Sequence, residues 1–410
     1  MPRYRPRHLS DRLKRALKTH PAVFLEGARQ VGKTTLVKKL ARELEMRYVT
    51  LDDLDLLTSA QADPEGFLTS WGEPLVIDEV QRAPELLLAI KARVDRKRAP
   101  GRYLLTGSAN VLALPRVAEA LVGRMAVLTL YPFSQGELEG RREAFLERAF
   151  RGRPHPEWGG ADVWERVRRG GFPEAVRLEN ADRAEWFSGY VRTLLERDVR
   201  DISGVEQVAV LHALLALLAE RTGSLLNISE LSRSLGRPRS TTDKYLRLFE
   251  KLFLVHRLPA WAANPTKRLT RSPKLHMVDT GLAVHLARVF NEGALLETFV
   301  TMELTKQLSW TTEPYRLAHF RDASGREVDL VLEGPEGLVG IEVKSKRRVG
   351  PGDFSGLRVL KRSAPERFRA GFVLHPGPQA LPFGDHLWSL PIQAVWRWGN
   401  DDPKNGSELE

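Results

Sequence analysis

The stretch that decides the fold runs from Val23 to Thr34 and reads VFLEGARQVGKT. Its last eight residues match the pattern G-x-x-x-x-G-K-[ST], directly after an apolar run and at the start of a segment with helical periodicity. In this setting glycines let backbone N–H groups curl around a phosphate, and the first turn of the helix adds a favourable dipole. The stretch therefore predicts a phosphate-binding loop between a strand and a helix.

A nucleoside triphosphate, ATP with Mg²⁺, is the ligand expected on this loop, with Lys33 against the β and γ phosphates and the Thr34 hydroxyl on the metal. A second part of the site is predicted at LVIDE (75–79), where Asp78 holds the magnesium shell and Glu79 polarises the attacking water. Two acids after a strand can also cap a helix, but the phosphate loop favours the catalytic interpretation. The predicted nucleotide-binding residues are Gly27, Ala28, Arg29, Gln30, Val31, Gly32, Lys33, Thr34, Thr35, Asp78 and Ser108.

The order of these elements resembles the AAA+ and related ATPases, in which a further strand lies between the phosphate-loop strand and the acidic strand and carries a polar sensor. Here that strand is 102–105, and the sensor candidates that follow it are Thr106, Ser108 and Asn110, among which the sequence does not choose. An arginine finger is also expected in such a site. Arg124 is the first candidate and Arg197 the second.

Composition limits the remaining possibilities. The chain has 410 residues, a formal net charge of +11 and no cysteine, which excludes disulfides and zinc–thiolate sites. The positive charge favours a polyanionic partner, nucleic acid first. No run approaches the roughly 18 apolar residues that span a membrane, and no apolar stretch follows the basic N-terminus. A cytoplasmic protein without membrane association is expected.

Short apolar runs alternate with amphipathic stretches in the first 130 residues, which predicts an α/β unit with a parallel sheet. Helical patterns dominate from 161 to about 253, and a second α/β unit follows. In the first unit, strands are expected at 22–25, 47–51, 75–77, 102–105 and 126–130, and helices at 34–45, 84–96 and 111–121. In the second, helices are expected at 295–308 and 354–362, and strands at 315–320, 328–332, 338–343, 370–374 and 392–396.

The middle of the chain contains a candidate helix-turn-helix. Its first helix is NISELSRSLG (227–236), closed by a glycine, and its second begins near 239. Segments 254–258 and 274–278 could pair as a wing. The alternative is a helical pair used for protein packing. The residues expected to contact DNA are Arg239, Ser240, Thr241 and Lys244.

The C-terminal unit contains an acidic constellation. Asp329 lies in one predicted strand, and Glu342 and Lys344 lie on one face of the next, since side chains alternate along a strand. Glu297, on the preceding helix, could complete a cluster that binds Mg²⁺ or Mn²⁺. Spacing and element order resemble the PD-(D/E)xK nuclease superfamily, in which Glu297, Asp329, Glu342 and Lys344 take the positions of the motif. The alternative is that these residues lie on the solvent-exposed face of an amphipathic hairpin and bind no metal.

Nearly the whole chain resembles a prokaryotic family of predicted AAA-type ATPases with a C-terminal uncharacterised domain, through 27–35, 75–82 (LVIDEVQR), 105–110, 131–134, 274–282 (KLHMVDTGL), 296–299 and 326–344. The resemblance implies an ATPase with a winged-helix segment and a nuclease-like end. The predicted parts are an ATPase core (1–135), a helical lid-like segment (136–205), a winged-helix-like domain (206–280), a restriction-endonuclease-like α/β domain (281–400) and a disordered tail (401–410).

Three functions stay open on this evidence. The first is a DNA-associated ATPase whose C-terminal unit binds or cuts DNA, with Glu342 and Lys344 catalytic there. The second is a nucleotide-gated switch for protein partners, with an inactive nuclease-like domain. The third is a metal-dependent endonuclease to which the ATPase regulates access. A homo-oligomer is left open, because an arginine acting in trans requires at least two copies.

Overall fold

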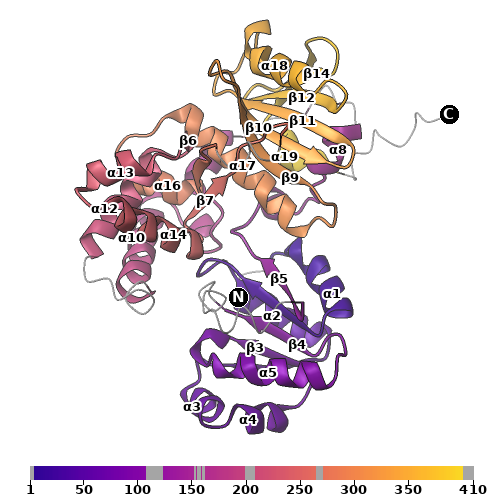
Figure 1. Ribbon diagram of the computed structural model, residues 1–410, viewed down its shortest axis with the longest axis vertical. Coiled ribbons are helices and arrows are strands. Elements are labelled where there is room, and N and C mark those ends of the chain that lie inside the picture. The colour runs from indigo at the N-terminus through magenta and orange to yellow at the C-terminus, as the bar shows by residue number, and fades with distance from the viewer. Residues whose placement is uncertain are drawn as a thin grey trace, which may run out of the picture. The chain divides into compact units, whose positions relative to one another are not determined.

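A computed structural model describes residues 4–107, 123–151, 154, 158, 162–198, 208–264 and 271–399, with the backbone alone at 197 and 198. The chain forms two compact units, one of Met1–Phe133 with Lys251–Phe253 and one of Ser134–Glu250 with Leu254–Glu410 (Figure 1). The finer division of the second unit into lid-like, winged-helix-like and nuclease-like parts stays a prediction.

The first unit is built on a five-stranded parallel sheet in the order β2-β3-β4-β1-β5. The predicted parallel sheet is confirmed, and so is the strand expected between the phosphate-loop strand and the acidic strand, which is β4. The strands are β1 (Ala22–Glu26), β2 (Arg47–Thr50), β3 (Leu75–Asp78), β4 (Tyr103–Thr106) and β5 (Met125–Thr129).

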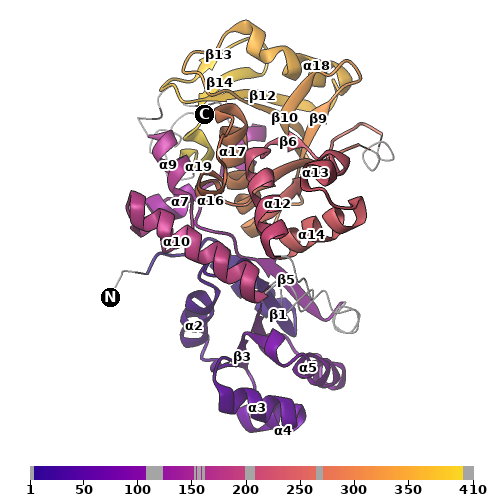
Figure 2. The same ribbon diagram turned by 90° about the vertical axis from the view of Figure 1, so that its left-hand side faces the viewer.

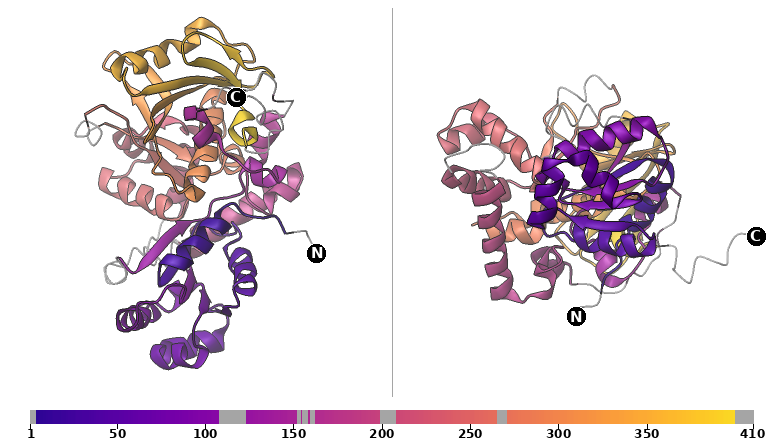
Figure 3. Two further views of the ribbon diagram at one scale, coloured as in Figure 1. Left: turned by 90° about the vertical axis from the view of Figure 1, so that its right-hand side faces the viewer. Right: turned by 90° about the horizontal axis from the view of Figure 1, so that it is seen from below.

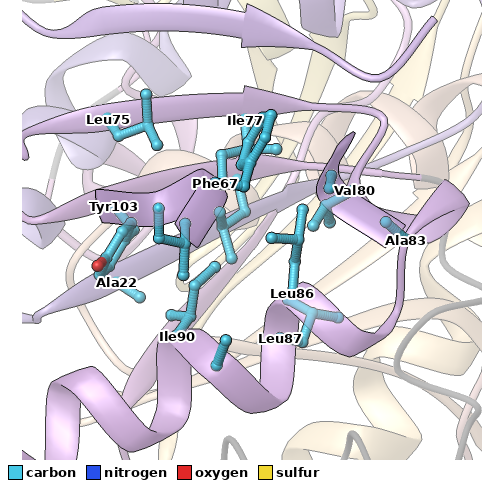
Figure 4. Close-up of a cluster of buried hydrophobic side chains, with 14 of the residues drawn as sticks. Ala22, Phe67, Leu75, Ile77, Val80, Ala83, Leu86, Leu87, Ile90 and Tyr103 are labelled. Carbon is cyan, nitrogen blue, oxygen red and sulfur yellow. The ribbon is translucent and has the colours of Figure 1, made fainter. Parts of the chain in front are cut away.

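Helices cover both faces of this sheet, with α2 and α5 on opposite sides (Figure 2). Alternate strand residues such as Ala22, Ile77 and Tyr103 pack against Leu86 and Ile90 of α5 and form one core, shown in Figure 4. The predicted helix at 111–121 lies outside the described residues. The helices are α1 (Leu9–Thr19), α2 (Lys33–Glu43), α3 (Leu54–Ala62), α4 (Pro64–Trp71) and α5 (Glu85–Arg96), with a 3₁₀ turn η1 (Val80–Arg82).

In the second unit, helices lead into a small antiparallel sheet of order β6-β8-β7. The predicted pairing of the segments at 254–258 and 274–278 is confirmed by β7 and β8. Gly236 ends α13 in the left-handed conformation, with φ 61°, as the sequence predicted. The elements are α7 (Gln135–Glu139), α8 (Phe145–Arg151), α9 (Val163–Arg169), η3 (Ala175–Arg177), α10 (Asn180–Thr193), η4 (Leu194–Asp198), α12 (Val208–Glu220), β6 (Ser224–Leu225), α13 (Ile228–Leu235), α14 (Arg239–Lys251), β7 (Val255–Leu258), β8 (Lys274–Met277) and α16 (Thr280–Leu286).

A six-stranded mixed sheet of order β13-β14-β12-β11-β10-β9 completes the unit and forms the curved orange and yellow layer of Figure 3. The predicted order of helix, three strands, helix and strand is confirmed. Helices α17 and α18 lie on opposite faces of the sheet (Figure 2). The elements are α17 (Glu292–Trp310), β9 (Arg316–Arg321), β10 (Glu327–Gly334), β11 (Gly337–Val343), η5 (Pro351–Phe354), α18 (Ser355–Ser363), β12 (Phe368–His375), β13 (Leu381–Pro382), β14 (Leu387–Pro391) and α19 (Ala394–Arg397).

The prediction of a last strand at 392–396 is wrong. The strand is β14 (Leu387–Pro391), and the following residues turn into the short helix α19. The turn buries Trp396 completely, and its indole N–H donates to Glu139 at 3.0 Å. Tertiary packing of this indole therefore overrides the strand propensity of the Val–Trp pair. Across the described residues, no helix is both long and apolar enough to cross a bilayer.

Candidate functional site

The loop between β1 and α2 has the backbone that a phosphate cradle requires. Gly27 has φ 150°, and a Cβ there would lie 2.2 Å from the Leu130 carbonyl oxygen, so only glycine fits. Gln30 and Gly32 also have positive φ values, 59° and 95°. These turns end at the first residue of α2, where the N–H groups of the first helical turn have no intrahelical acceptor and can face an anion.

Lys33 lies at the centre of this loop. Its Nζ donates to the carbonyl oxygens of Gly27 and Ala28, both at 2.9 Å, and the residue is 7% exposed. The ammonium is therefore held inside the curl of the loop that would surround the phosphates. Thr34, on the first turn of α2, is half-buried, whereas Thr35 is exposed.

An arginine that sequence reasoning missed supports the loop. Arg7 donates from Nη1 to the Val31 carbonyl at 2.8 Å and from Nη2 to the Tyr131 carbonyl at 2.5 Å. Its guanidinium also stacks on the Phe133 ring, 4.6 Å from the centroid. Arg7 is one of several arginines near the N-terminus, so nothing in the sequence distinguishes it from its neighbours. In the structure it ties the phosphate loop to the segment after β5.

At the carboxyl end of β3, Asp78 is 1% exposed and lies in a polar network. The Tyr48 hydroxyl donates to Asp78 Oδ2 at 2.9 Å, and the Thr106 hydroxyl donates to Oδ1. Thr106 also accepts from the Glu79 backbone N–H at 3.2 Å. Burial and the neighbouring Asp78 carboxylate raise the pKa of Tyr48, so this phenol stays a neutral donor. Thr106, the sensor candidate that lies within the described residues, contacts both acids.

Glu79 has a left-handed backbone, with φ 58°. Few residues other than glycine and asparagine adopt this conformation, and its strain is concentrated at functional sites. Gln81 Nε2 donates to Glu79 Oε2 and so orients the carboxylate. Glu79 is therefore held just beyond the carboxyl end of β3, and its role as the residue that polarises water stays a prediction.

The structure does not bring Arg124, the first arginine candidate, to this edge. Arg124 directly precedes β5, whose first residue pairs with Ala22 at the start of β1. It therefore lies at the amino edge of the sheet, opposite the loop, and its Nε contacts Asp95. Its role as a finger stays a prediction that requires contact with a second copy. Ser108, Asn110 and the Arg197 side chain lie outside the described residues.

The second helix of the predicted helix-turn-helix presents its first residues to solvent. On α14, Arg239, Ser240 and Lys244 are exposed and Thr241 is half-buried. Leu246 and Phe249 on the same helix are fully buried. A polar, basic N-terminal face on a helix anchored by an apolar one can contact phosphates and base edges.

The C-terminal carboxylates gather as predicted. Strands β10 and β11 pair as a hairpin across Gly334 and Gly337, and Lys344 Nζ contacts Glu342 Oε2 at 3.1 Å. Asp329 lies where the register of β10 against β9 shifts, and its Oδ2 accepts from the Val343 N–H at 2.9 Å. Such irregularities re-aim side chains. Burial, followed by the Asp329 carboxylate, raises the pKa of Glu342 well above its usual range.

A lysine that was not predicted enters this cluster. Lys274 Nζ lies 2.8 Å from Glu297 Oε1 and 3.4 Å from Asp329 Oδ1. Burial opposes its charge, but the two carboxylates outweigh that effect and raise the pKa of Lys274. Burial, with Asp329, raises the pKa of Glu297 to about 8 against the opposing effect of Lys274.

This arrangement bears on the metal role predicted for Glu297, Asp329 and Glu342. Among the described residues, no group of three or more His, Asp or Glu side chains is arranged to hold a metal ion. Magnesium would need oxygen ligands at roughly 2.0–2.1 Å, and an ammonium lies between two of the candidate ligands. The residues as placed do not fit a divalent cation.

The family models that match this chain include one for its N-terminal part. Residues 19–139 match the model of the AAA domain family. With the phosphate loop and the strand order, this match supports an AAA-type ATPase domain of the P-loop class in this part of the chain. Residues 160–293 and 292–395 match two models described as domains of unknown function, DUF8612 and DUF4143. Lys274 and its carboxylate partners therefore come from two separately matched regions.

Relatives extend the similarity over the chain. An uncharacterized protein of Mycobacterium tuberculosis is 29% identical over 97% of this chain and 86% of its own length. One of Haemophilus influenzae is 24% identical over 58% of each chain. Among solved structures, a Walker-type ATPase of Pyrococcus abyssi has a TM-score of 0.41 at 17% identity, over 68% of this chain and 94% of that one. AMPPCP-bound DnaA from Aquifex aeolicus has a TM-score of 0.27 at 14% identity, over 59% and 86%.

Proposed function

We propose that this chain hydrolyses ATP with Mg²⁺ on the first unit and binds DNA through α14. The observation that carries the ATPase proposal is the network at the sheet edge: Thr106 contacts both Asp78 and Glu79, at the carboxyl end of the strand next to β1. This network supports two acids with separate tasks. Asp78 is fixed by two hydroxyl donors, while Glu79 is left half-exposed and oriented by Gln81.

The loop and the residues around it have separate roles in this proposal. The ammonium of Lys33 binds the β and γ phosphates and stabilises the charge that develops as the terminal phosphoryl group leaves. Backbone N–H groups between Gly27 and Lys33 hold the phosphate oxygens. Glu79 accepts a proton from the attacking water. Arg7 keeps the loop in its curled form through its bond to Val31.

Magnesium fits this site, in contrast to the C-terminal one. It needs few protein ligands, because phosphates and water supply the rest, and the Thr34 hydroxyl with the Asp78 carboxylate offers a suitable set. When bound, it would supply the positive charge that stabilises the phosphates during transfer. We expect turnover of ATP to fall to background when Mg²⁺ is removed with EDTA and to return on its addition, as measured by phosphate release. Full turnover in EDTA would contradict this role.

DNA association rests on the exposed start of α14 and on the net charge of +11. The helices α12, α13 and α14 and the sheet of β6, β8 and β7 support a winged-helix interpretation of this segment. Arg239 and Lys244 are both exposed on α14, and each is proposed to contact a phosphate. Binding through such contacts releases counterions, so affinity falls steeply with salt.

The double variant Arg239→Ala/Lys244→Ala is expected to weaken binding to a short random-sequence duplex. Because each lost phosphate contact reduces the salt slope by about 1, the slope of log K against log salt should fall by about 2. Fluorescence anisotropy at several salt concentrations measures it. Arg177→Ala/Arg192→Ala is the matched control, since it removes two arginines, 41% and 75% exposed, from other parts of the same unit.

Equal losses of DNA affinity in the two double variants would mean that binding depends only on the net charge of the protein and that DNA does not contact α14. The absence of any salt-dependent binding would favour the second function, a nucleotide-gated switch for a protein partner. DNA-stimulated ATP turnover would favour the first. In either function, the nuclease-like part of the second unit contributes its fold and no catalysis, because the carboxylate cluster does not fit a metal.

A further inference from the structure

The strand β8 carries a lysine into the carboxylate cluster from outside the segment that forms the six-stranded sheet. The Lys274 side chain is 4% exposed, and its two acidic partners, Glu297 on α17 and Asp329 on β10, are 10% and 12% exposed. The other lysine of the cluster, Lys344, is 33% exposed and contacts Glu342. The cluster thus has a buried end closed by Lys274 and a more open end at Lys344.

We propose that the Lys274 ammonium takes the place of a divalent cation in this cluster, so that the unit holds its carboxylates together without metal and does not cleave phosphodiesters. The ammonium contacts one oxygen of Glu297 and one of Asp329. The second oxygen of Asp329 is already bonded to the Val343 N–H. A metal ion between Glu297 and Asp329 would have to displace a buried positive charge.

The surroundings of Glu297 favour a fixed internal cation. His276, two residues after Lys274 on β8, is fully buried and donates to or accepts from the Thr298 hydroxyl through Nδ1 at 3.0 Å. Its Nε2 has no hydrogen-bond partner and lies 3.9 Å from Glu297 Oε1. Burial lowers the pKa of His276 well below its usual range, and Lys274 acts in the same direction. Lys274 is therefore the cation that Glu297 contacts directly, and the imidazole stays neutral beside it.

The ion cluster has a structural consequence. Because Lys274 belongs to the three-stranded sheet and Asp329 to the six-stranded one, the buried bonds join the two sheets. Buried charges left without a partner are strongly destabilising, whereas a complete set of partners is tolerated. Removing Lys274 should therefore leave carboxylate oxygens without a partner, and a divalent cation can bind them. We expect the Lys274 side chain to block a divalent-cation site that appears when this side chain is removed.

The test uses the full chain without nucleotide and MnCl₂ as the probe. Lys274→Ala is expected to unfold at a lower temperature than the native chain and to gain a Mn²⁺ site. At Mn²⁺ concentrations about 100-fold above its dissociation constant, its Tm should rise by roughly 3–5 °C. Isothermal titration should show one additional site. Mn²⁺ bound near Asp78 raises the Tm of all chains equally, so the native chain should show only that shared rise.

Two variants make the result specific. Lys274→Ala/Asp329→Asn should lose the Mn²⁺-dependent rise, because one of the vacated ligands is gone. Lys306→Ala removes another buried lysine, which faces Glu303 at 2.6 Å; it should be destabilised without Mn²⁺ rescue. A folded Lys274→Ala chain that gains no Mn²⁺ site would overturn the proposal.

If Lys274→Ala does not fold, Mn²⁺ binding by the native chain tests the proposal. Mn²⁺ binding by the native chain that is lost in Asp329→Asn would show that metal enters the cluster despite the lysine, and the proposal would be wrong. Equal Mn²⁺ responses of these two chains would support it. Nicking of supercoiled plasmid by the native chain with Mn²⁺, absent in Asp329→Asn, would contradict it as well. None of these outcomes depends on the ATPase.

Discussion

Replacing Glu79 by Gln is expected to lower ATP turnover by about 10²- to 10⁴-fold, the contribution of a positioned general base. The amide has nearly the shape of the carboxylate but cannot accept a proton from water. Because the change is made beyond the phosphate loop, ATP should still bind, and the variant should retain ATP through a desalting column. Turnover is measured by phosphate release and binding by a fluorescent ATP analogue.

Glu85→Gln is the control for this substitution. Glu85 begins α5 a few residues further along the chain and is exposed. The same loss of charge there should leave turnover unchanged. Unchanged turnover in Glu79→Gln itself would exclude Glu79 as the base. A parallel loss of ATP binding would instead indicate that the contact of the Glu79 carboxylate with Gln81 holds the site together.

Replacing Lys33 by Ala is expected to reduce ATP turnover by about 10²- to 10³-fold or more, since a preorganised charge at the phosphates is removed. Unlike Glu79→Gln, this variant should also bind ATP weakly. The ammonium has a second task, because its bonds to the Gly27 and Ala28 carbonyls keep the loop curled. Titration with the fluorescent analogue, beside phosphate release, separates the two effects.

Lys39→Ala is the matched control, because it removes another lysine from the same helix. Lys39 is 44% exposed and pairs with Glu43 on the surface, an interaction worth little. It should bind and hydrolyse ATP like the native chain. Lys33→Arg keeps the charge, but its planar fork needs more room than the buried ammonium, so only partial recovery is expected. Undiminished turnover in Lys33→Ala would rule out the proposed phosphate contact.

Local patterns were sufficient for much of the fold. The strand before Gly27, the glycines of the loop and the acids after Ile77 are each readable within a few residues, because a turn, a strand and a helix start are specified by neighbours in the chain. The same holds for the hairpin that brings Glu342 next to Asp329. The short helix at 394–397 was mispredicted, because only the buried environment of Trp396 selects it.

Motif and strand pattern already place a phosphate loop and an acidic strand end at one sheet edge, because parallel strands put their carboxyl ends on the same side. The other side chains that complete the two sites become visible only in the fold. Arg7 reaches Val31 across 24 residues, and Lys274 reaches Asp329 across 55. Each is one basic residue among 63, and what distinguishes it is its burial against specific oxygens. Such burial is set by packing between distant segments, and local sequence does not record it.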